Sequence, residues 1–491
     1  MPGIANRIAS ARRSGTEWAA QPVKARLRIL GRFRQALPTH VDRLVAAVES
    51  RRPRAPGETI AAEILPLAEA VRFLEMNAAQ ILAPRYEPSS FLPLWLTRTE
   101  LEIRREPCGV ILIIGPSNYP LMLPGIQAAQ ALAAGNAVLI KPGVGGSPSM
   151  QLFAKLLTAA GLNSELCQVL SEDPESAQEA IATGVDKVIL TGSAGTGRKV
   201  MQQLASSLTP SVMELSGCDA VFVLADADLD LVVRALLFGM RLNSSATCIA
   251  PRRVFAHERI ADDLTSRLTA AFQALPSCRP PPAWAARARR LVKEALAQGA
   301  VCLAGNIAEA EAFSPTLLGS VNPKMAAVNE DITAPVLSVF SVANDEEALV
   351  LSAQCRYALG ATVFGSESKA MELAGRIKAG TVVVNDMIAP TADPRLPFGG
   401  RGRSGFGVTR GREGLLEMTR VKTICTRHGY WRPHLDPPVP ASGDLMRAYL
   451  TASHGATLWE RLGAMKRTIG ALIRMRRTRD AQDQAEGTSH E

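Results

Sequence analysis

The chain has 491 residues, of which 47% are hydrophobic, 21% charged and 5% aromatic, and its formal net charge is +9. This length allows two or three domains, and the composition is that of an ordinary globular protein. The charge is moderate and lies partly in the C-terminal tail, so we expect no nucleic acid partner.

The cysteines and the apolar runs indicate the compartment. Eight cysteines are scattered along the chain without a CxxC pair, which favours neither a disulfide framework nor a zinc site. We therefore expect no metal. The N-terminus has no apolar signal segment, and no run reaches the length of a membrane span. These features predict a reducing, cytoplasmic location.

Residues 1–84 predict a helical region. Apolar residues recur at helical spacing in three of its segments, 26–37, 41–48 and 60–81. The segment 51–57 contains two prolines and a glycine and predicts a loop. Segment 92–105 alternates polar and apolar residues, which predicts an extended edge hairpin. Such an arm could pair with another subunit.

From Gly109 onward, short apolar runs alternate with helical segments. The expected strands are 110–114, 137–140, 168–170 and 187–190, and the expected helices are 126–134, 150–160 and 175–182. This alternation predicts βαβ units and a parallel, doubly wound, Rossmann-like sheet. Such sheets bind ligands at the carboxyl ends of their strands. Three motifs fall there: Gly115–Asn118, Lys141–Gly143 and Thr191–Gly197.

One glycine-rich segment, 192–197, is the candidate for phosphate binding. The glycines of 192–197 let the backbone come close to a phosphate group, and the helix that follows has an N-terminus that favours an anion. Its order is GxxGxG, whereas a literal GxGxxG stands at 400–405. The second segment follows Leu396-Pro-Phe-Gly399 and not a strand, so we expect it to be a loop.

Cys248 is the candidate nucleophile. A turn of small polar residues, Asn243-Ser-Ser-Ala-Thr, delivers it just before a strand-like run, and Glu214 is the nearest upstream base. A thiol and a carboxylate with apolar neighbours predict covalent catalysis by a thiolate with a general base. The alternative is that Cys248 is a small buried hydrophobic residue.

Beyond Cys248 the alternation of helices and strands resumes. The expected helices are 260–272, 287–298 and 370–379, and the expected strands are 336–342, 360–364 and 381–385. This pattern predicts a second α/β unit between about Cys218 and Arg403.

The ordered motifs together resemble the aldehyde dehydrogenase superfamily, from roughly residue 20 to residue 426. The matching segments are Ile114–Pro120 (the family's PWNFP), Gly135–Pro142 (GNxVxxKP), Leu190–Ser193 (FTGS), Met213–Gly217 (LELGG), Asn243–Cys248 (NxGQxC, in its ends but not its middle), and Pro397–Gly400 with Ser404–Gly405 (PFGG…SG). Within the superfamily, Leu208–Pro210 and Thr247–Pro251 are similar to the class 3 and fatty-aldehyde branch.

The resemblance implies an α/β fold with three parts. A doubly wound cofactor-binding domain comprises residues 1–91, 106–216 and 404–424, and a second α/β domain, residues 217–403, is catalytic. Residues 92–105 form a small β arm for oligomerisation, so a homodimer or higher homo-oligomer is expected.

The resemblance also implies a reaction, the oxidation of an aldehyde to a carboxylic acid with NAD or NADP. Cys248 attacks the aldehyde carbonyl and forms a thiohemiacetal. Transfer of a hydride to the nicotinamide leaves a thioester, and Glu214 activates the water that hydrolyses it. The Asn118 amide and the Cys248 backbone N–H hold the developing oxyanion.

The family's cofactor contacts transfer to this chain with several departures. Lys141 is expected to bond the adenosine ribose and Ser193 the pyrophosphate. The other expected cofactor-binding residues are Pro116, Ser117, Gly192, Gly197 and Asp331. Val144 stands where the family often has a ribose-binding glutamate, and the loss of this carboxylate makes NADP an expected cofactor beside NAD. Asp331 replaces another ribose-binding glutamate, and Thr333 replaces a phenylalanine near the nicotinamide.

Two alternatives stay open. In a CoA-acylating dehydrogenase CoA would resolve the thioester, and Glu214 argues against this because water needs a base and CoA does not. A catalytically silent homologue could serve as a scaffold. The altered cofactor contacts favour that hypothesis, and the joint presence of Cys248, Glu214, Asn118 and Lys141 argues against it.

Residues 430–491 fall outside the resemblance. After a proline-rich linker, apolar residues recur at helical spacing among arginines and lysines: Leu458, Leu462, Met465, Ile469 and Leu472. This pattern predicts a basic amphipathic helix. It could make peripheral contact with an anionic membrane surface, cap the substrate entrance or a neighbouring subunit, or pack on its own protein with its charged face in solvent.

Overall fold

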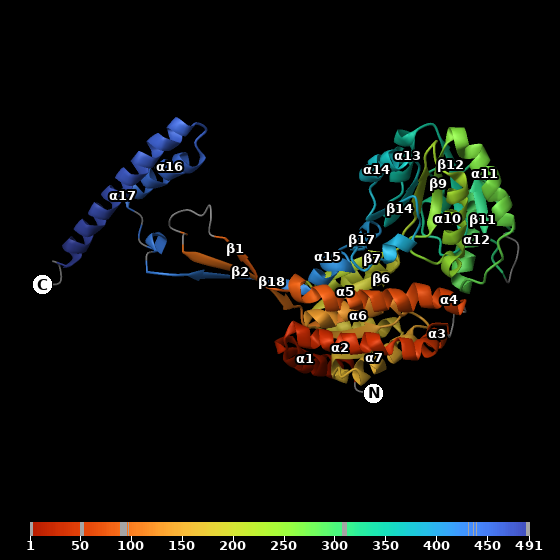
Figure 1. Cartoon of the computed structure of the whole chain (residues 1–491), viewed down its shortest axis with the longest axis horizontal. Coiled ribbons are helices and arrows are strands. Elements are labelled where there is room, and N and C mark those ends of the chain that lie inside the picture. Colours follow the sequence, from red (N-terminus) through yellow and green to blue (C-terminus); the bar gives the residue numbers. More distant parts are fainter. Residues whose placement is uncertain are drawn as a thin grey trace. The chain divides into compact units, whose positions relative to one another are not determined.

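The computed structural model describes residues 3–49, 54–88, 96, 98–306, 312–430, 432–435, 437 and 439–487. Met1–Pro84 and Arg104–Lys422 form one compact unit, and Arg85–Ile103 and Thr423–Glu491 form another. The larger unit contains both large sheets of the protein (Figure 1).

The first sheet has six strands in the order β17-β7-β6-β3-β4-β5. Their bounds are β3 Val110–Ile114, β4 Ala137–Lys141, β5 Cys167–Val169, β6 Lys187–Gly192, β7 Ser211–Leu215 and β17 Gly405–Phe406. Strands β3 to β7 pair in parallel, and β17 is antiparallel to β7. Every residue of β3 and β4 is buried, which explains the unbroken apolar runs of these strands. The predicted doubly wound sheet is confirmed.

Helices cover this sheet and begin at the N-terminus, as predicted. Their bounds are α1 Ile4–Ala20, α2 Val23–Ala36, α3 Val41–Glu49, α4 Pro56–Thr59, α5 Leu65–Ile81, α6 Met122–Ala134, α7 Ser147–Ala159, α8 Pro174–Thr183, α9 Ala194–Ala205 and α15 Gly411–Glu417. A π-helical turn, Ile60–Ile64, joins α4 to α5. Helix α5 packs on both α2 and α6, so the N-terminal helices belong to the core of this sheet (Figure 1).

The second sheet has seven strands in the order β10-β11-β12-β9-β8-β14-β15. The strands are β8 Asp219–Val223, β9 Pro251–His257, β10 Val301–Ala304, β11 Thr316–Gly319, β12 Val336–Val342, β14 Gly360–Phe364 and β15 Thr381–Val384. The helices are α10 Leu229–Arg241, α11 Glu258–Gln273, α12 Pro282–Ala297, α13 Asp345–Ala353 and α14 Glu367–Arg376. All pairs are parallel except β10 with β11. The second α/β sheet is therefore present, as the alternation predicted.

The segment 400–405 is not the loop that we expected. It contains the short strand β16, Arg401–Gly402, which pairs with β13, Tyr357–Ala358, and it leads into β17. Gly405 has φ +99°, and a Cβ atom there would lie 1.8 Å from the carbonyl oxygen of Met213. Only glycine permits this approach of β17 to β7, so the glycine serves strand pairing.

A three-stranded sheet has the order β1-β2-β18, with β1 Arg85–Glu87, β2 Thr99–Pro107 and β18 Thr419–Arg427. β1 pairs antiparallel with β2. Residues 99–105 of the predicted arm, 92–105, belong to β2 and are extended. Residues 92–95 and 97 lie outside the described residues.

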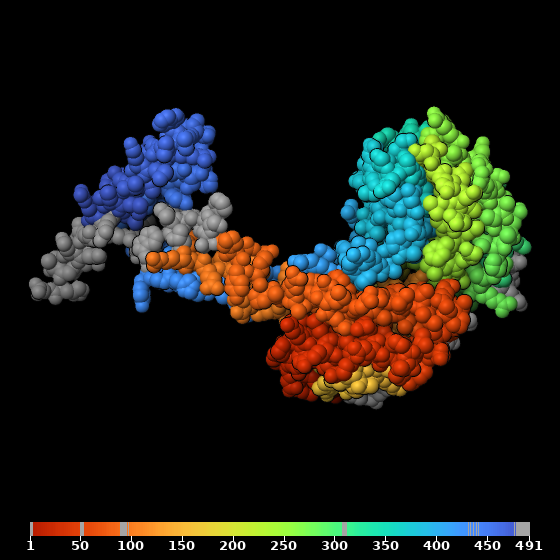
Figure 2. Space-filling model, viewed as in Figure 1, coloured from red at the N-terminus to blue at the C-terminus, as the bar shows by residue number. Residues whose placement is uncertain are grey.

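The C-terminal tail forms two helices where we predicted one. These are α16 Pro440–His454 and α17 Leu458–Gly487, and they pack against each other (Figure 1). Figure 2 draws the atoms of this region in dark blue. In the described part of the chain, no helix combines the length and the apolar character that crossing a bilayer requires.

Candidate active site

A cavity of about 280 Å³ lies at the carboxyl ends of β3, β4, β6 and β7, beside the loop that precedes β9. All the predicted site residues except Gly197 line it: Pro116, Ser117, Asn118, Lys141, Gly192, Ser193, Glu214, Cys248 and Asp331. Trp284, Val144 and Thr333 also contribute to the wall. The structure therefore brings together residues that are more than 200 positions apart in the chain.

The thiol of Cys248 faces the carboxylate of Glu214. The Sγ–Oε1 distance is 3.7 Å, within the range of a thiol hydrogen bond. Glu214 lies on β7 and is buried, and Thr191 Oγ1 donates to its Oε2 at 3.0 Å. Gln127 on α6 donates in turn to Thr191 Oγ1 at 3.0 Å. A chain of hydrogen bonds thus fixes the orientation of the candidate base.

Burial sets the protonation of this pair. It raises the pKa of Glu214, against the opposing charge of Arg410 and the hydrogen bond from Thr191. It also raises the pKa of the Cys248 thiol well above its ordinary value, and the negative charges of Glu214 and Asp219 add to the effect. Without ligand the cysteine is therefore a protonated thiol at neutral pH, and the carboxylate beside it can accept its proton.

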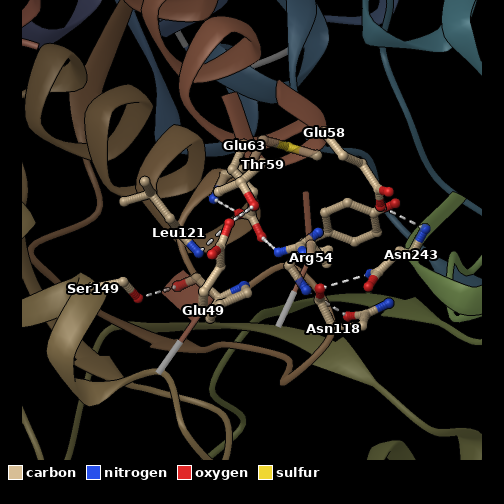
Figure 3. Close-up of polar contacts among 12 residues, drawn as sticks. Glu49, Arg54, Glu58, Thr59, Glu63, Asn118, Leu121, Ser149 and Asn243 are labelled. Atoms are coloured by element: carbon tan, nitrogen blue, oxygen red, sulfur yellow. Dashed lines mark hydrogen bonds and ion pairs between the residues drawn. The ribbon is translucent and has the colours of Figure 1, made fainter. Parts of the chain in front are cut away.

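The loop that carries Cys248 has a left-handed backbone. Asn243, Ser244 and Ser245 have φ values of 52°, 51° and 58°. Left-handed conformations are costly for residues other than glycine, so surrounding contacts must hold the loop. On one side Glu58 on α4 accepts from the Asn243 backbone N–H at 2.7 Å (Figure 3). On the other side Arg252 contacts Ser245.

Asn118 links the two loops of the site. Its Nδ2 donates to the Ala246 carbonyl at 2.7 Å, and its own carbonyl accepts from Asn243 Nδ2 at 2.9 Å (Figure 3). The hydroxyls of Tyr119 and Thr247 lie 2.6 Å apart. The loop after β3 and the loop that carries Cys248 are thereby joined next to the thiol, where an oxyanion donor would act.

A buried ion pair supports these loops. Arg54 Nη2 lies 2.7 Å from Glu63 Oε1, and Glu63 Oε2 accepts from the backbone N–H groups of Leu121 and Met122 at 3.1 and 2.7 Å (Figure 3). Both charged side chains are at most 5% exposed. Glu63 therefore fixes the chain between Asn118 and the start of α6.

The Lys141 end of the cavity has an unpaired cation. Lys141 is 8% exposed, and among the described residues its ammonium makes no hydrogen bond or ion pair. Burial lowers its pKa, and the carboxylates of Glu172, Asp173 and Glu175 oppose this shift. A buried cation that opens on a cavity fits an oxygen-rich ligand, such as the ribose of a dinucleotide.

Ser193, Gly192 and Asp331 also fit a dinucleotide. Ser193 begins α9, and its Oγ accepts from Thr196 N at 3.1 Å. Asp331 is buried, which raises its pKa, and a hydrogen bond from Ser216 opposes this shift. The residues at this end therefore present hydroxyl, carboxyl and ammonium groups to the cavity, as a nicotinamide dinucleotide requires.

Gly197 has a different position from the one that we expected. It does not line the cavity. A Cβ atom on Gly197 would lie 2.8 Å from Leu215 Cδ1, so the glycine allows α9 to pack on β7. The absence of a side chain at Gly197 therefore serves helix–sheet packing, and its contact with the cofactor stays a prediction.

Sequence reasoning missed six charged residues around the site: Arg54, Glu58, Glu63, Glu172, Arg252 and Arg410. The only available signal was the position of Arg252, four residues after the cysteine. The other five lie far from Cys248 in the chain and give no local pattern.

The fold is an α/β fold with a doubly wound sheet, and its cavity, at the carboxyl ends of that sheet's strands, has a thiol and a carboxylate on its wall. The chain belongs to the aldehyde dehydrogenase family, whose model matches residues 3–424. It is therefore an oxidoreductase that acts on aldehydes with NAD or NADP.

Named relatives and solved structures agree with the family. The chain is 30% identical over 426 residues to 4,4'-diapolycopene aldehyde oxidase of Methylomonas sp, covering 85% of this chain and 80% of the relative. It is 28% identical to a Mycolicibacterium smegmatis protein provisionally named succinate-semialdehyde dehydrogenase [NADP(+)], covering 91% and 88%. The fold matches Mycobacterium tuberculosis aldehyde dehydrogenase complexed with NAD+ with a TM-score of 0.80, 23% identity and coverage of 88% and 92%.

Proposed function

We propose that Cys248, Glu214 and Asn118 carry out the oxidation of an aldehyde to a carboxylic acid in this protein. The contact between Cys248 Sγ and Glu214 Oε1 at 3.7 Å, on the wall of the cavity, carries this proposal. Glu214 accepts the thiol proton, and the Cys248 sulfur adds to the aldehyde carbon. The Asn118 amide donates to the oxygen that becomes negative.

The second half of the reaction uses the same residues. Bound NAD or NADP supplies the hydride acceptor, and Cys248 is left holding an acyl group as a thioester. Glu214 would first release the thiol proton to solvent and become a carboxylate again. It then takes a proton from water, whose oxygen attacks the thioester carbon, so the C–S bond breaks and the acid leaves with Cys248 as a thiolate. Lys141, Ser193 and Asp331, with Pro116, Ser117 and Gly192, would hold the dinucleotide, and the six-stranded sheet would be the cofactor-binding domain.

We propose an apolar aldehyde as the substrate. The relative from Methylomonas sp is named for a diapolycopene aldehyde. A short carboxylated aldehyde would need a cation near the sulfur. Among the described residues that line the cavity, Lys141 is the only cationic one, and the cofactor proposal already uses it.

We also propose a homo-oligomer that forms through the three-stranded sheet. Strand β18 is an edge strand whose residues are largely exposed, and Val421 on it is 57% exposed. Exposed edges of this kind pair readily with another strand. Light scattering on the wild type and on Val421→Lys would test the proposal, and a monomeric wild type would contradict it.

For the tail we propose peripheral contact with an anionic membrane surface. One set of apolar side chains on α17 is exposed: Leu458, Trp459, Leu462, Met465, Ile469 and Ile473. Basic residues, including Arg461, Lys466 and Arg467, lie between them. Sedimentation with anionic and zwitterionic vesicles, for the wild type and Trp459→Glu, would test this contact. Equal recovery with both vesicle types would contradict it.

Nicotinamide reduction, followed by absorbance, tests the proposed reaction. Short, aromatic and long-chain aldehydes are offered with NAD or NADP, with and without CoA, to the wild type and to Cys248→Ala. We expect reduction without CoA, fastest with long-chain aldehydes and lost in the variant. Strict dependence on CoA would instead establish the acylating reaction. Turnover that survives in Cys248→Ala would refute the assigned nucleophile.

A further inference from the structure

Glu172 lies beside the turn that carries Val144. Its carboxylate accepts a hydrogen bond from Gly145 N to Oε2 and another from Ser147 N to Oε1, both at 2.8 Å. These amides stand at the N-terminus of α7, where backbone N–H groups have no partner within the helix. The carboxylate therefore occupies donors that an incoming anion would otherwise use.

This turn borders the active-site cavity. Val144 and Lys141 line the same cavity as Cys248, and Val144 is 64% exposed. Glu172 follows β5, the strand that pairs with the end of β4 where Lys141 lies. A fixed carboxylate and a cation without a hydrogen-bond partner in the described chain thus flank one turn of the cavity wall.

We propose that Glu172 is a specificity-determining residue that makes this enzyme prefer NAD to NADP. The inference rests on the proposed function, which assigns Lys141 to the adenosine ribose. A ribose 2′-hydroxyl can donate to a carboxylate oxygen. A 2′-phosphate would instead meet a fixed negative charge and would find the α7 amides already occupied.

Glu172 thereby changes the expectation drawn from Val144 alone. The carboxylate that the family places at the position of Val144 is missing there, but a carboxylate is supplied to the same turn from the loop after β5. The reason for expecting NADP, the absence of a negative charge, does not hold in the folded protein.

Isothermal titration of the full-length protein with NAD+ and with NADP+, without aldehyde, tests the inference. We expect the Kd for NADP+ to be at least about tenfold higher than that for NAD+. The difference between the two Kd values should shrink as the salt concentration rises, because salt screens the repulsion between Glu172 and the 2′-phosphate. Glu172→Gln keeps the size of the side chain and removes its charge, and it should close most of the gap. The ratio of kcat/KM for the two cofactors should follow the same order.

Glu175→Gln is the matched control. Glu175 lies in the first turn of α8 and acts on Lys141 through its charge, but among the described residues it makes no hydrogen bond to the turn. Its substitution removes the same charge and should leave the Kd ratio near that of the wild type. Thermal unfolding of both variants shows whether the fold is retained.

A wild-type protein that binds NADP+ as tightly as NAD+, or more tightly, overturns the inference, and so does an unchanged ratio in a folded Glu172→Gln. If that variant does not fold, the ratio of the wild-type Kd values for NADP+ and NAD+, and the change of this ratio with salt, still test the inference. A protein that binds neither dinucleotide overturns the proposed function as well, whereas equal binding of both overturns only the role of Glu172.

Discussion

Arg252 holds Ser245 through two hydrogen bonds, from Nη1 to Oγ at 2.7 Å and from Nη2 to the carbonyl oxygen at 2.5 Å. Ser245 stands where the family motif has a glycine, and its φ is 58°. A left-handed residue other than glycine costs about 1–3 kcal/mol. The buried guanidinium, which also bonds the Ala334 carbonyl at 2.9 Å, offsets this cost three residues before Cys248.

Arg252→Gln should therefore lower kcat more in the native loop than in one that carries glycine. We expect a loss of roughly 100-fold, because a misplaced reacting group costs about that much. Ser245→Gly removes the backbone strain, so in a protein that already carries Ser245→Gly the Arg252→Gln substitution should lower kcat much less. Steady-state kinetics of the wild type, the two single variants and the double variant measures this coupling between Arg252 and Ser245. Equal losses in both backgrounds would show that Arg252 does not position the loop.

Arg253→Gln is the control for that cycle. Arg253 is also buried, but its guanidinium bonds the carbonyls of Cys218 and Ser352 and not the loop. Any loss of kcat that Arg253→Gln causes should be the same with serine and with glycine at position 245. If Ser245→Gly relieved both arginine variants alike, the effect would be general stabilisation.

Glu214→Gln should make Cys248 more reactive in the protein without cofactor. Burial and then the negative charge of Glu214 raise the pKa of the thiol, so loss of that charge lowers the pKa and increases the thiolate fraction at pH 8. We expect several-fold faster alkylation of Cys248 by iodoacetamide, measured by mass spectrometry of its peptide, and a loss of aldehyde oxidation. Slower alkylation would mean that Glu214 already deprotonates the thiol at rest.

Asn118→Ala should lower kcat by about 10²–10³-fold, the usual cost of losing one oxyanion donor. The Kd for the dinucleotide should change little, because the Asn118 side-chain amide donates to the loop that carries Cys248. Tyr119→Phe is the matched variant. It removes only the contact of the Tyr119 hydroxyl with Thr247, so its kcat should stay much closer to the wild-type value. Similar losses in both variants would favour a structural role for Asn118.

Arg54→Met should destabilise the fold by about 3–5 kcal/mol, because it leaves the Glu63 carboxylate buried without its cation. Burial raises the pKa of Glu63 even beside Arg54, and loss of the cation should raise this pKa further. The destabilisation should therefore grow as the pH rises above 4.5, the ordinary value for glutamate. Urea unfolding at two pH values measures it. Arg54→Met with Glu63→Gln should recover much of the loss, and no recovery would exclude this explanation.

The sequence was sufficient for the parts of the fold that bury both faces of a strand. Residues 110–114 and 137–140 are unbroken apolar runs because helices cover both sides of the first sheet. Cys248 and Glu214 were found because their ordered motifs match those of the family. The helix α16 was missed, although Leu445 and Ala448 on it are buried at helical spacing.

The supporting charges could not be predicted in this way. Glu58, Glu63 and Glu172 each accept backbone N–H groups from segments that are distant in sequence, and no local pattern marks such contacts. The contact of Gly197 with Leu215 was not predicted either, because a glycine in a glycine-rich segment has the same appearance whether it faces a ligand or a packed side chain. Only the tertiary structure distinguishes these cases.

The pairing of β17 with β7 has a consequence for the synthesis of the protein. Glu214 stands opposite Gly405 in this ladder, and Leu215 N donates to the Ser404 carbonyl at 3.1 Å. The strand that carries Glu214 therefore gains its outer neighbour only after the ribosome has made nearly 200 further residues. While the chain is emerging, β7 is therefore an open edge of the first sheet, although Thr191 can already bond the Glu214 carboxylate, and the ladder that closes this edge forms late in translation.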